Sequence, residues 1–138
     1  MDEKAEVLKI ELGQTIKAGS TGRLNIDFSG VVNDKMAGFY RSSYHHEEKQ
    51  KYMVSTQFEA TDARRAFPCW DEPAAKATFT ISIKLPESLT ALSNMSVKAV
   101  AVDHDTHLKV VTFMKTPLVS TYLIAWAVGE LDDGGRVA

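Results

Sequence analysis

The chain has 138 residues, of which 44% are hydrophobic and 25% are charged, values typical of one soluble globular domain. A formal net charge of −2 argues against nucleic acid or an anionic membrane as a partner. No apolar run approaches 18 residues, the N-terminus is acidic, and Cys69 is the only cysteine, so we expect a cytoplasmic protein without an intrachain disulfide or a membrane span.

Alternation of apolar and polar residues dominates the chain and predicts antiparallel strands. A first pair is expected at 8–12 and 24–28, joined by a turn at 19–22. The next pair is expected at 38–44 and 51–58, with a polar loop between them. Later strands are expected at 78–83, 97–102, 108–113 and 122–128, with 87–96 and 103–106 as connections.

One short helical turn is expected near 61–66, with Thr61 as its N-cap. Pro68 and Pro73 prevent it from growing into a long helix. About eight strands with frequent turns predict an all-β fold, either an antiparallel sandwich or a curved sheet, formed as one unit over residues 1–138.

Motifs of known catalytic centres are missing from the sequence. It contains no Gly-x-Ser-x-Gly elbow, phosphate-binding glycine loop or His-Glu-x-x-His pair. The run at 45–48 (HHEE) is better explained as a solvated loop, because adjacent residues of a strand point to opposite faces. The pair His104 and His107 is better explained as a surface turn, because no third ligand is obvious. Cys69, without a histidine at a recognisable spacing, is expected to be a buried small hydrophobic residue.

The segment 55–73, STQFEATDARRAFPCWDEP, combines charges with bulky apolar residues. If Phe58 enters the core, Gln57 and Glu59 face outward together from one strand. Spacing alone favours a surface strand whose Glu59 pairs with a neighbouring arginine. The alternative is a polar hook, in which carboxylate and amide are aimed at a cationic or amine-bearing ligand.

The block QFEATDARRAFPCWDEPAAKATFTISI at 57–83 strongly resembles the N-terminal domain of gluzincin zinc aminopeptidases, of the puromycin-sensitive and fungal alanine/arginine types. Two further segments also resemble that domain: GFYRSSY at 38–44 and STYLIAWAVGEL at 120–131. The resemblance covers nearly the whole chain and implies a saddle-shaped antiparallel β domain.

The resemblance also implies roles for individual residues. Glu59 is similar to the family glutamate that binds the free α-amino group of the substrate, and Gln57 to a position lining the first side-chain pocket. Peptide N-termini are therefore the implied partner. A second glutamate of the family comes from a Gly-x-Met-Glu-Asn loop, which this chain lacks.

The other charged residues of the block are expected to support the turn that carries Glu59, through ion pairs and hydrogen bonds. They are Arg64, Arg65, Asp71 and Glu72. Three aromatic residues are expected in the core rather than at a ligand: Phe67, Trp70 and Phe79.

Family members hold zinc in a domain that follows this one, and none of those ligands lies in 1–138. The resemblance thus implies most of an N-terminal domain, without its leading strands and without the catalytic zinc domain. We expect zinc in the full-length parent, no metal and no peptidase activity in this chain alone, and self-association through exposed sheet edges. The competing hypothesis is an autonomous, non-enzymatic β-sandwich binding or scaffold module.

Overall fold

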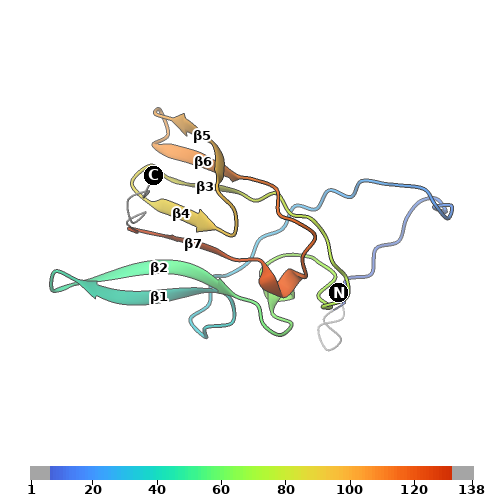
Figure 1. The fold of residues 1–138 in the computed structure, drawn as a ribbon, viewed down its shortest axis with the longest axis horizontal. Coiled ribbons are helices and arrows are strands. Elements are labelled where there is room, and N and C mark those ends of the chain that lie inside the picture. Colours follow the sequence, from blue (N-terminus) through green and yellow to red (C-terminus); the bar gives the residue numbers. More distant parts are fainter. Residues whose placement is uncertain (1–6, 132–138) are drawn as a thin grey trace.

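A computed structural model describes residues 7–131 of the chain. Strands of these residues form two antiparallel sheets, and the helical elements among them are two short 3-10 turns, so the predicted all-β fold is confirmed. The four-stranded sheet has the order β1-β2-β7-β4 and the three-stranded sheet the order β3-β6-β5 (Figure 1). The strands are β1 (Gly38–His46), β2 (Lys49–Gln57), β3 (Ser82–Pro86), β4 (Thr90–Ser93), β5 (Val97–Asp103), β6 (Leu108–Phe113) and β7 (Trp126–Gly129).

The longest hairpin joins β1 to β2, and it corrects the loop predicted at 45–51. Both strands run on to a two-residue turn, in which Glu47 and Glu48 have φ angles of 48° and 63°. Such left-handed pairs match the twist of a hairpin. This turn could not be predicted from the sequence, because neither residue is the Asn or Gly that usually occupies such a position.

The hairpin of β5 and β6 was predicted correctly at its turn. Asp103 pairs with Leu108, and Oδ1 of Asp103 accepts hydrogen bonds from the backbone N–H groups of Asp105 and Thr106. His104 and His107 both lie in this turn.

Two apolar clusters form the core. The first is built by the buried Leu85, Ala91, Val111 and Phe113, from β3, β4 and β6. The second surrounds Phe58, Ala63 and Ile124, and the rings of Phe67, Phe79 and Trp126 pack against it. Phe58 lies edge-on to Trp126 with ring centroids 5.4 Å apart. Because Phe58 directly precedes Glu59, this second cluster anchors the candidate site.

Several predicted boundaries are wrong. The connection predicted at 87–96 contains β4, and the strand predicted at 122–128 is interrupted: a 3-10 turn (Thr121–Leu123) precedes the short β7. The strand expected at 78–83 begins only at Ser82. Each of these strands begins where its residues pair with a neighbouring strand, and not where apolar and polar residues begin to alternate.

The first predicted strand pair is also absent from the structure. Residues 7–32, here called the arm, are exposed throughout and belong to neither sheet. A turn is present at 17–20, two residues before the turn predicted at 19–22, with Gly19 at a φ of 80° and the Ser20 N–H bonded to the Lys17 carbonyl. The runs at 8–12 and 24–28 nevertheless stay unpaired, because alternation makes a strand only where another strand offers its hydrogen bonds.

Candidate functional site

The candidate site lies where β2 ends and the chain turns into the 3-10 helix η1 (Ala63–Arg65). Gln57 is the last residue of β2, pairs with Gly38 of β1, and is exposed. Phe58 is only 2% exposed, so its side chain fills the core and the residues on either side turn outward. Glu59 is accordingly exposed.

A tight turn fixes the backbone around Glu59. The Asp62 N–H donates to the Phe58 carbonyl at 2.9 Å, which encloses Glu59, Ala60 and Thr61 in one turn. The 3-10 helix follows at once, and its N-cap is Asp62 rather than the predicted Thr61. The Asp62 side chain makes no capping hydrogen bond; it forms an ion pair with Arg65, with 2.6 Å between Oδ1 and Nε.

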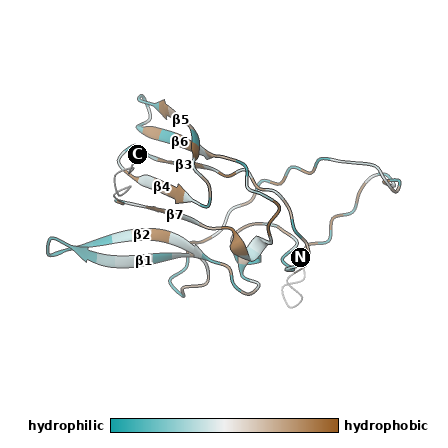
Figure 2. Ribbon diagram, viewed as in Figure 1, coloured by the Kyte–Doolittle hydropathy of each residue, from teal (hydrophilic) through white to brown (hydrophobic). Residues whose placement is uncertain are grey.

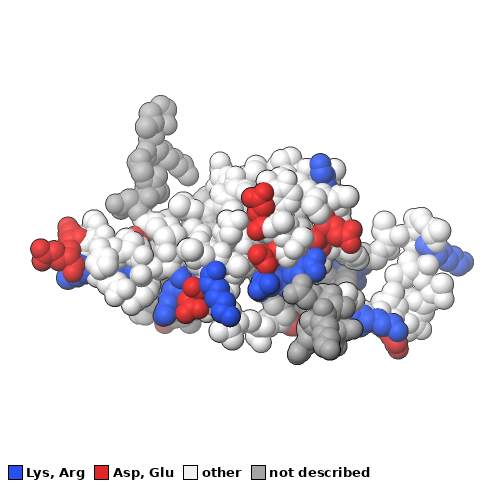
Figure 3. Space-filling model, turned by 90° about the horizontal axis from the view of Figure 1, so that it is seen from below, with Lys and Arg blue, Asp and Glu red and all other residues white. Residues whose placement is uncertain are grey.

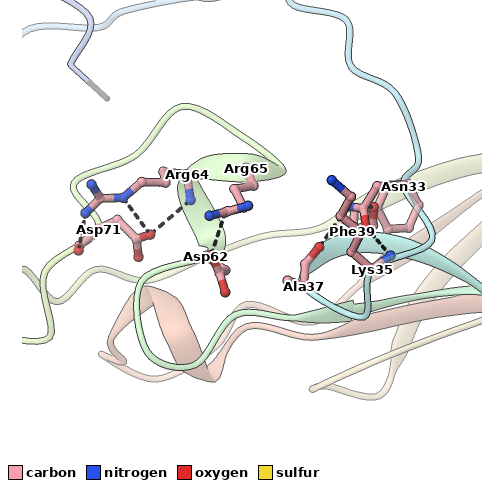
Figure 4. A network of polar contacts seen from close by, with 8 residues as sticks. All are labelled: Asn33, Lys35, Ala37, Phe39, Asp62, Arg64, Arg65 and Asp71. Carbon is pink, nitrogen blue, oxygen red and sulfur yellow. Dashed lines mark hydrogen bonds and ion pairs between the residues drawn. The ribbon is translucent and has the colours of Figure 1, made fainter. Parts of the chain in front are cut away.

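Asp71 ties this turn to the following loop (Figure 4). Its carboxylate is buried, with only 2% of the side chain exposed. Oδ2 accepts from the backbone N–H of Arg64 at 3.0 Å and from its Nε at 3.2 Å, and another guanidinium nitrogen donates to the Asp71 carbonyl at 3.1 Å. Oδ1 accepts from the Thr121 hydroxyl at 2.8 Å. One carboxylate therefore connects η1 to Thr121, which lies fifty residues after Asp71 in the sequence.

The four charged residues predicted to support Glu59 do not form one network. Arg64 and Asp71 contact each other, whereas Arg65 is paired with Asp62. The Glu72 side chain is exposed and makes no hydrogen bond or ion pair with residues 7–131. Asp62 and Thr121 complete the support, and no local pattern could have indicated Thr121, because its partner Asp71 lies fifty residues away in the chain.

The Glu59 carboxylate has no ion pair or hydrogen bond within the described part of the chain. The two arginines that could have paired with it point to Asp71 and Asp62 (Figure 4). An exposed, unpaired carboxylate on a well-fixed backbone can accept charge-assisted hydrogen bonds from an ammonium group at little cost in reorganisation. This is the chemistry that the site offers.

Two neighbours predicted to be apolar core differ from that expectation. Trp70 is 81% exposed, because Asp71 rather than Trp70 turns into the interior. Cys69 is half-buried against the second cluster, and burial raises the pKa of its thiol to about 11. At neutral pH this thiol is protonated and therefore a poor nucleophile.

Gly38 permits the close approach of β1 to η1. It has a φ of 70°, and a Cβ built on it would lie 2.8 Å from Cβ of Arg65. Gly38→Ala should therefore lower the free energy of unfolding by about 1–3 kcal/mol, as measured by urea denaturation. The matched change Gly30→Ala, at a position with nothing within 4 Å of the added Cβ, should have almost no effect. Equal effects would contradict this role for Gly38.

Other groups of polar residues lie elsewhere. A groove of about 460 Å³ at the far end of the hairpin is lined by Tyr44, Lys51 and Glu130 among others, and does not include Gln57 or Glu59. Within residues 7–131, no three His, Cys, Asp or Glu side chains gather into a possible metal site. Acidic and basic side chains are interspersed over the face seen in Figure 3.

The family comparison and the comparison with individual proteins both point to aminopeptidases. The model of the peptidase M1 N-terminal domain family matches residues 1–123. Over 130 residues the chain is 50% identical to Aminopeptidase M1 of Arabidopsis thaliana, and over 132 residues it is 47% identical to the puromycin-sensitive aminopeptidase of Caenorhabditis elegans. Aminopeptidase N of Bos taurus is 44% identical over 135 residues. These alignments cover 94%, 95% and 96% of this chain, but the chain spans only 14% of each relative.

Proposed function

The chain belongs to the family of peptidase M1 N-terminal domains, and we propose that it is the substrate-recognition part of a zinc-dependent metalloaminopeptidase, which removes N-terminal residues from peptides. In this proposal the carboxylate of Glu59 binds the α-ammonium group of the substrate. Gln57 is exposed like Glu59, while Phe58 between them is buried, and it lines the pocket for the first side chain of the substrate.

The state of Glu59 carries the proposal. Its carboxylate is exposed and has no partner in the described part of the chain, while the neighbouring charges of Asp62, Arg64, Arg65 and Asp71 are engaged with one another. A terminal ammonium is the one cation that every peptide substrate of an aminopeptidase offers at the point of recognition. A fixed carboxylate that binds it distinguishes a chain end from an internal peptide bond.

The hydrolytic step requires groups other than those of the candidate site. The residues at Glu59 do not suit a zinc ion, because the nearby Asp62 and Asp71 are committed to arginines. We therefore assign binding and orientation of the substrate to this chain, and assign zinc and bond cleavage to a catalytic domain in the parent polypeptide. A cytoplasmic location is part of the same proposal; among residues 7–131, no helix is both long and apolar enough to cross a membrane.

The proposal predicts that the chain alone is inactive. With an aminoacyl fluorogenic substrate and added zinc, the isolated chain should give no turnover above buffer. A chimera in which this chain replaces the matching segment of the Arabidopsis relative should retain aminopeptidase activity, because 50% identity preserves the fold that presents Glu59. Turnover by the isolated chain that Glu59→Ala abolishes would contradict the proposal. A folded but inactive chimera would favour the scaffold-module hypothesis.

A further inference from the structure

The residues after Glu59 are held by the 3-10 turn η2 (Thr121–Leu123). Its first residue, Thr121, is buried and donates its hydroxyl to the Asp71 carboxylate at 2.8 Å. The same carboxylate accepts the backbone N–H of Arg64, in the 3-10 helix η1 that follows the Glu59 turn. A displacement of η2 would therefore be transmitted to the turn that carries Glu59.

The residues before Glu59 are held by Trp126, three residues after the end of η2. Its backbone N–H donates to Oγ1 of Thr56 in β2 at 3.1 Å, and its ring packs edge-on to Phe58. Residues 121–126, here called the support segment, thus hold the chain on both sides of Glu59.

The side chain of Asn94 clamps the middle of the support segment. Asn94 directly follows β4, which is separated from β2 by β7 (Figure 1). Its Nδ2 donates to the Leu123 carbonyl at 2.8 Å, and its Oδ1 accepts the Ala125 N–H at 2.7 Å. The two bonds enclose the buried Ile124, in an apolar stretch of the chain (Figure 2). A donor and an acceptor are needed side by side here, and an amide side chain supplies both.

A clamp is needed because η2 has little rigidity of its own. Short 3-10 turns have poor hydrogen-bond geometry, and the N-cap residue Ser120 makes no side-chain capping bond. Ser120 bonds instead to the Pro73 carbonyl at 2.6 Å, so the near end of η2 is fastened to the loop that also contains Asp71. Asn94 fastens the far end of η2 to the end of β4, and thereby fixes η2 relative to the four-stranded sheet.

We propose that Asn94 is a positioning residue for substrate binding, which acts on Glu59 through the support segment and does not touch the substrate. The inference rests on the proposed function of Glu59. Loss of the Asn94 amide should loosen both contacts of the support segment and let the Glu59 carboxylate leave the orientation that suits an ammonium group. Because this weakens binding and not the chemical step, the change should raise KM and leave kcat almost unaltered.

Amide hydrogen exchange of the full chain tests the positioning without reference to activity. In the Asn94→Ala variant, the N–H groups of Asp62 and Arg64 should exchange at least about fivefold faster than in the parent. These two groups donate the hydrogen bonds that close the turn around Glu59 and join it to the following loop.

Asp103→Ala is the matched control for Asn94→Ala. It also removes a side chain that makes two hydrogen bonds to the backbone, but in the hairpin turn between β5 and β6. Exchange of the same two amides should then change by less than about twofold. Equal acceleration in the two variants would show a general loss of stability and would overturn the inference.

Kinetics of the chimera connect the positioning to substrate binding. Asn94→Ala should raise KM by about three- to tenfold with kcat within about twofold of the parent, and Asp103→Ala should leave both within about twofold. A purely structural role would lower the folded fraction, and so the apparent kcat, without a change in KM.

A double variant separates this inference from the proposed function. In the Glu59→Gln background, Asn94→Ala should change KM by less than about twofold, because the carboxylate to be positioned is gone. An undiminished effect in that background, or an unchanged KM in Asn94→Ala alone, would overturn the inference while Glu59→Gln still impairs the enzyme. If Glu59→Gln by itself has no effect on kcat/KM, the proposed function fails, and the role of Asn94 in binding fails with it.

Discussion

Asp71→Asn should lower the free energy of unfolding by about 2–4 kcal/mol. The Asp71 carboxylate is buried and accepts hydrogen bonds from the Arg64 backbone, the Arg64 side chain and the Thr121 hydroxyl. Asparagine keeps the size but presents an amide NH₂ to one of these donors and leaves the Arg64 guanidinium without its counter-charge. Urea denaturation of the two proteins, followed by far-UV circular dichroism, measures the difference.

The ion pair between Arg65 and Asp62 provides the control. Its arginine side chain is 55% exposed, so Asp62→Asn should cost less than about 1 kcal/mol. In the chimera, Asp71→Asn should also raise KM for many substrates alike, because the loosened turn carries Glu59 and not a side-chain pocket. A loss of stability no larger than that of Asp62→Asn would show that Asp71 does not hold this turn.

Glu59→Gln should lower kcat/KM of the chimera by about 10- to 150-fold. The substitution keeps the shape of the side chain and removes the negative charge that would bind the α-ammonium of the substrate. The Glu59 side chain is exposed and makes no hydrogen bond or ion pair within the described residues, so the change should leave the free energy of unfolding almost unaltered. Initial rates with an aminoacyl fluorogenic substrate, together with a urea titration, check both statements.

Glu72→Gln is the matched control for this variant. Glu72 is also an exposed acid without a side-chain partner in the described part of the chain, and it lies on the same segment. Its kcat/KM should stay within about twofold of the parent. Equal losses in the two variants would point to a general effect of negative charge on substrate attraction, and not to a specific bond at Glu59.

Local pattern predicted much of the fold because alternation and turn chemistry are local properties. Strand β6 was predicted at its observed bounds, Leu108–Phe113, and the helical turn near 61–66 corresponds to η1. The β1–β2 hairpin was predicted with a loop that is too long, since its turn uses Glu47 and Glu48 in a conformation that side chains seldom adopt. Short β4 escaped detection because its pairing with β7 comes from a distant segment.

For the candidate site as well, the local pattern predicted one part, and contacts between distant residues determine the rest. That Gln57 and Glu59 flank a core residue follows from the period of two in a strand, and Phe58 is indeed buried. The contacts that hold them do not follow from spacing: Asp71 bonds to Thr121, and each arginine binds a different aspartate. The exposure of Trp70 was missed for the same reason, since the loop directs Asp71 inward.

Competitive inhibition of the chimera by two matched peptides tests the role of Glu59 most directly. One peptide has a free α-amino group and the other has hydrogen in its place. With Glu59 present, the amine should strengthen inhibition by at least about tenfold, and in the Glu59→Gln variant most of that advantage should disappear. The same advantage in both proteins would contradict the account, because the amine would then be bound by another group.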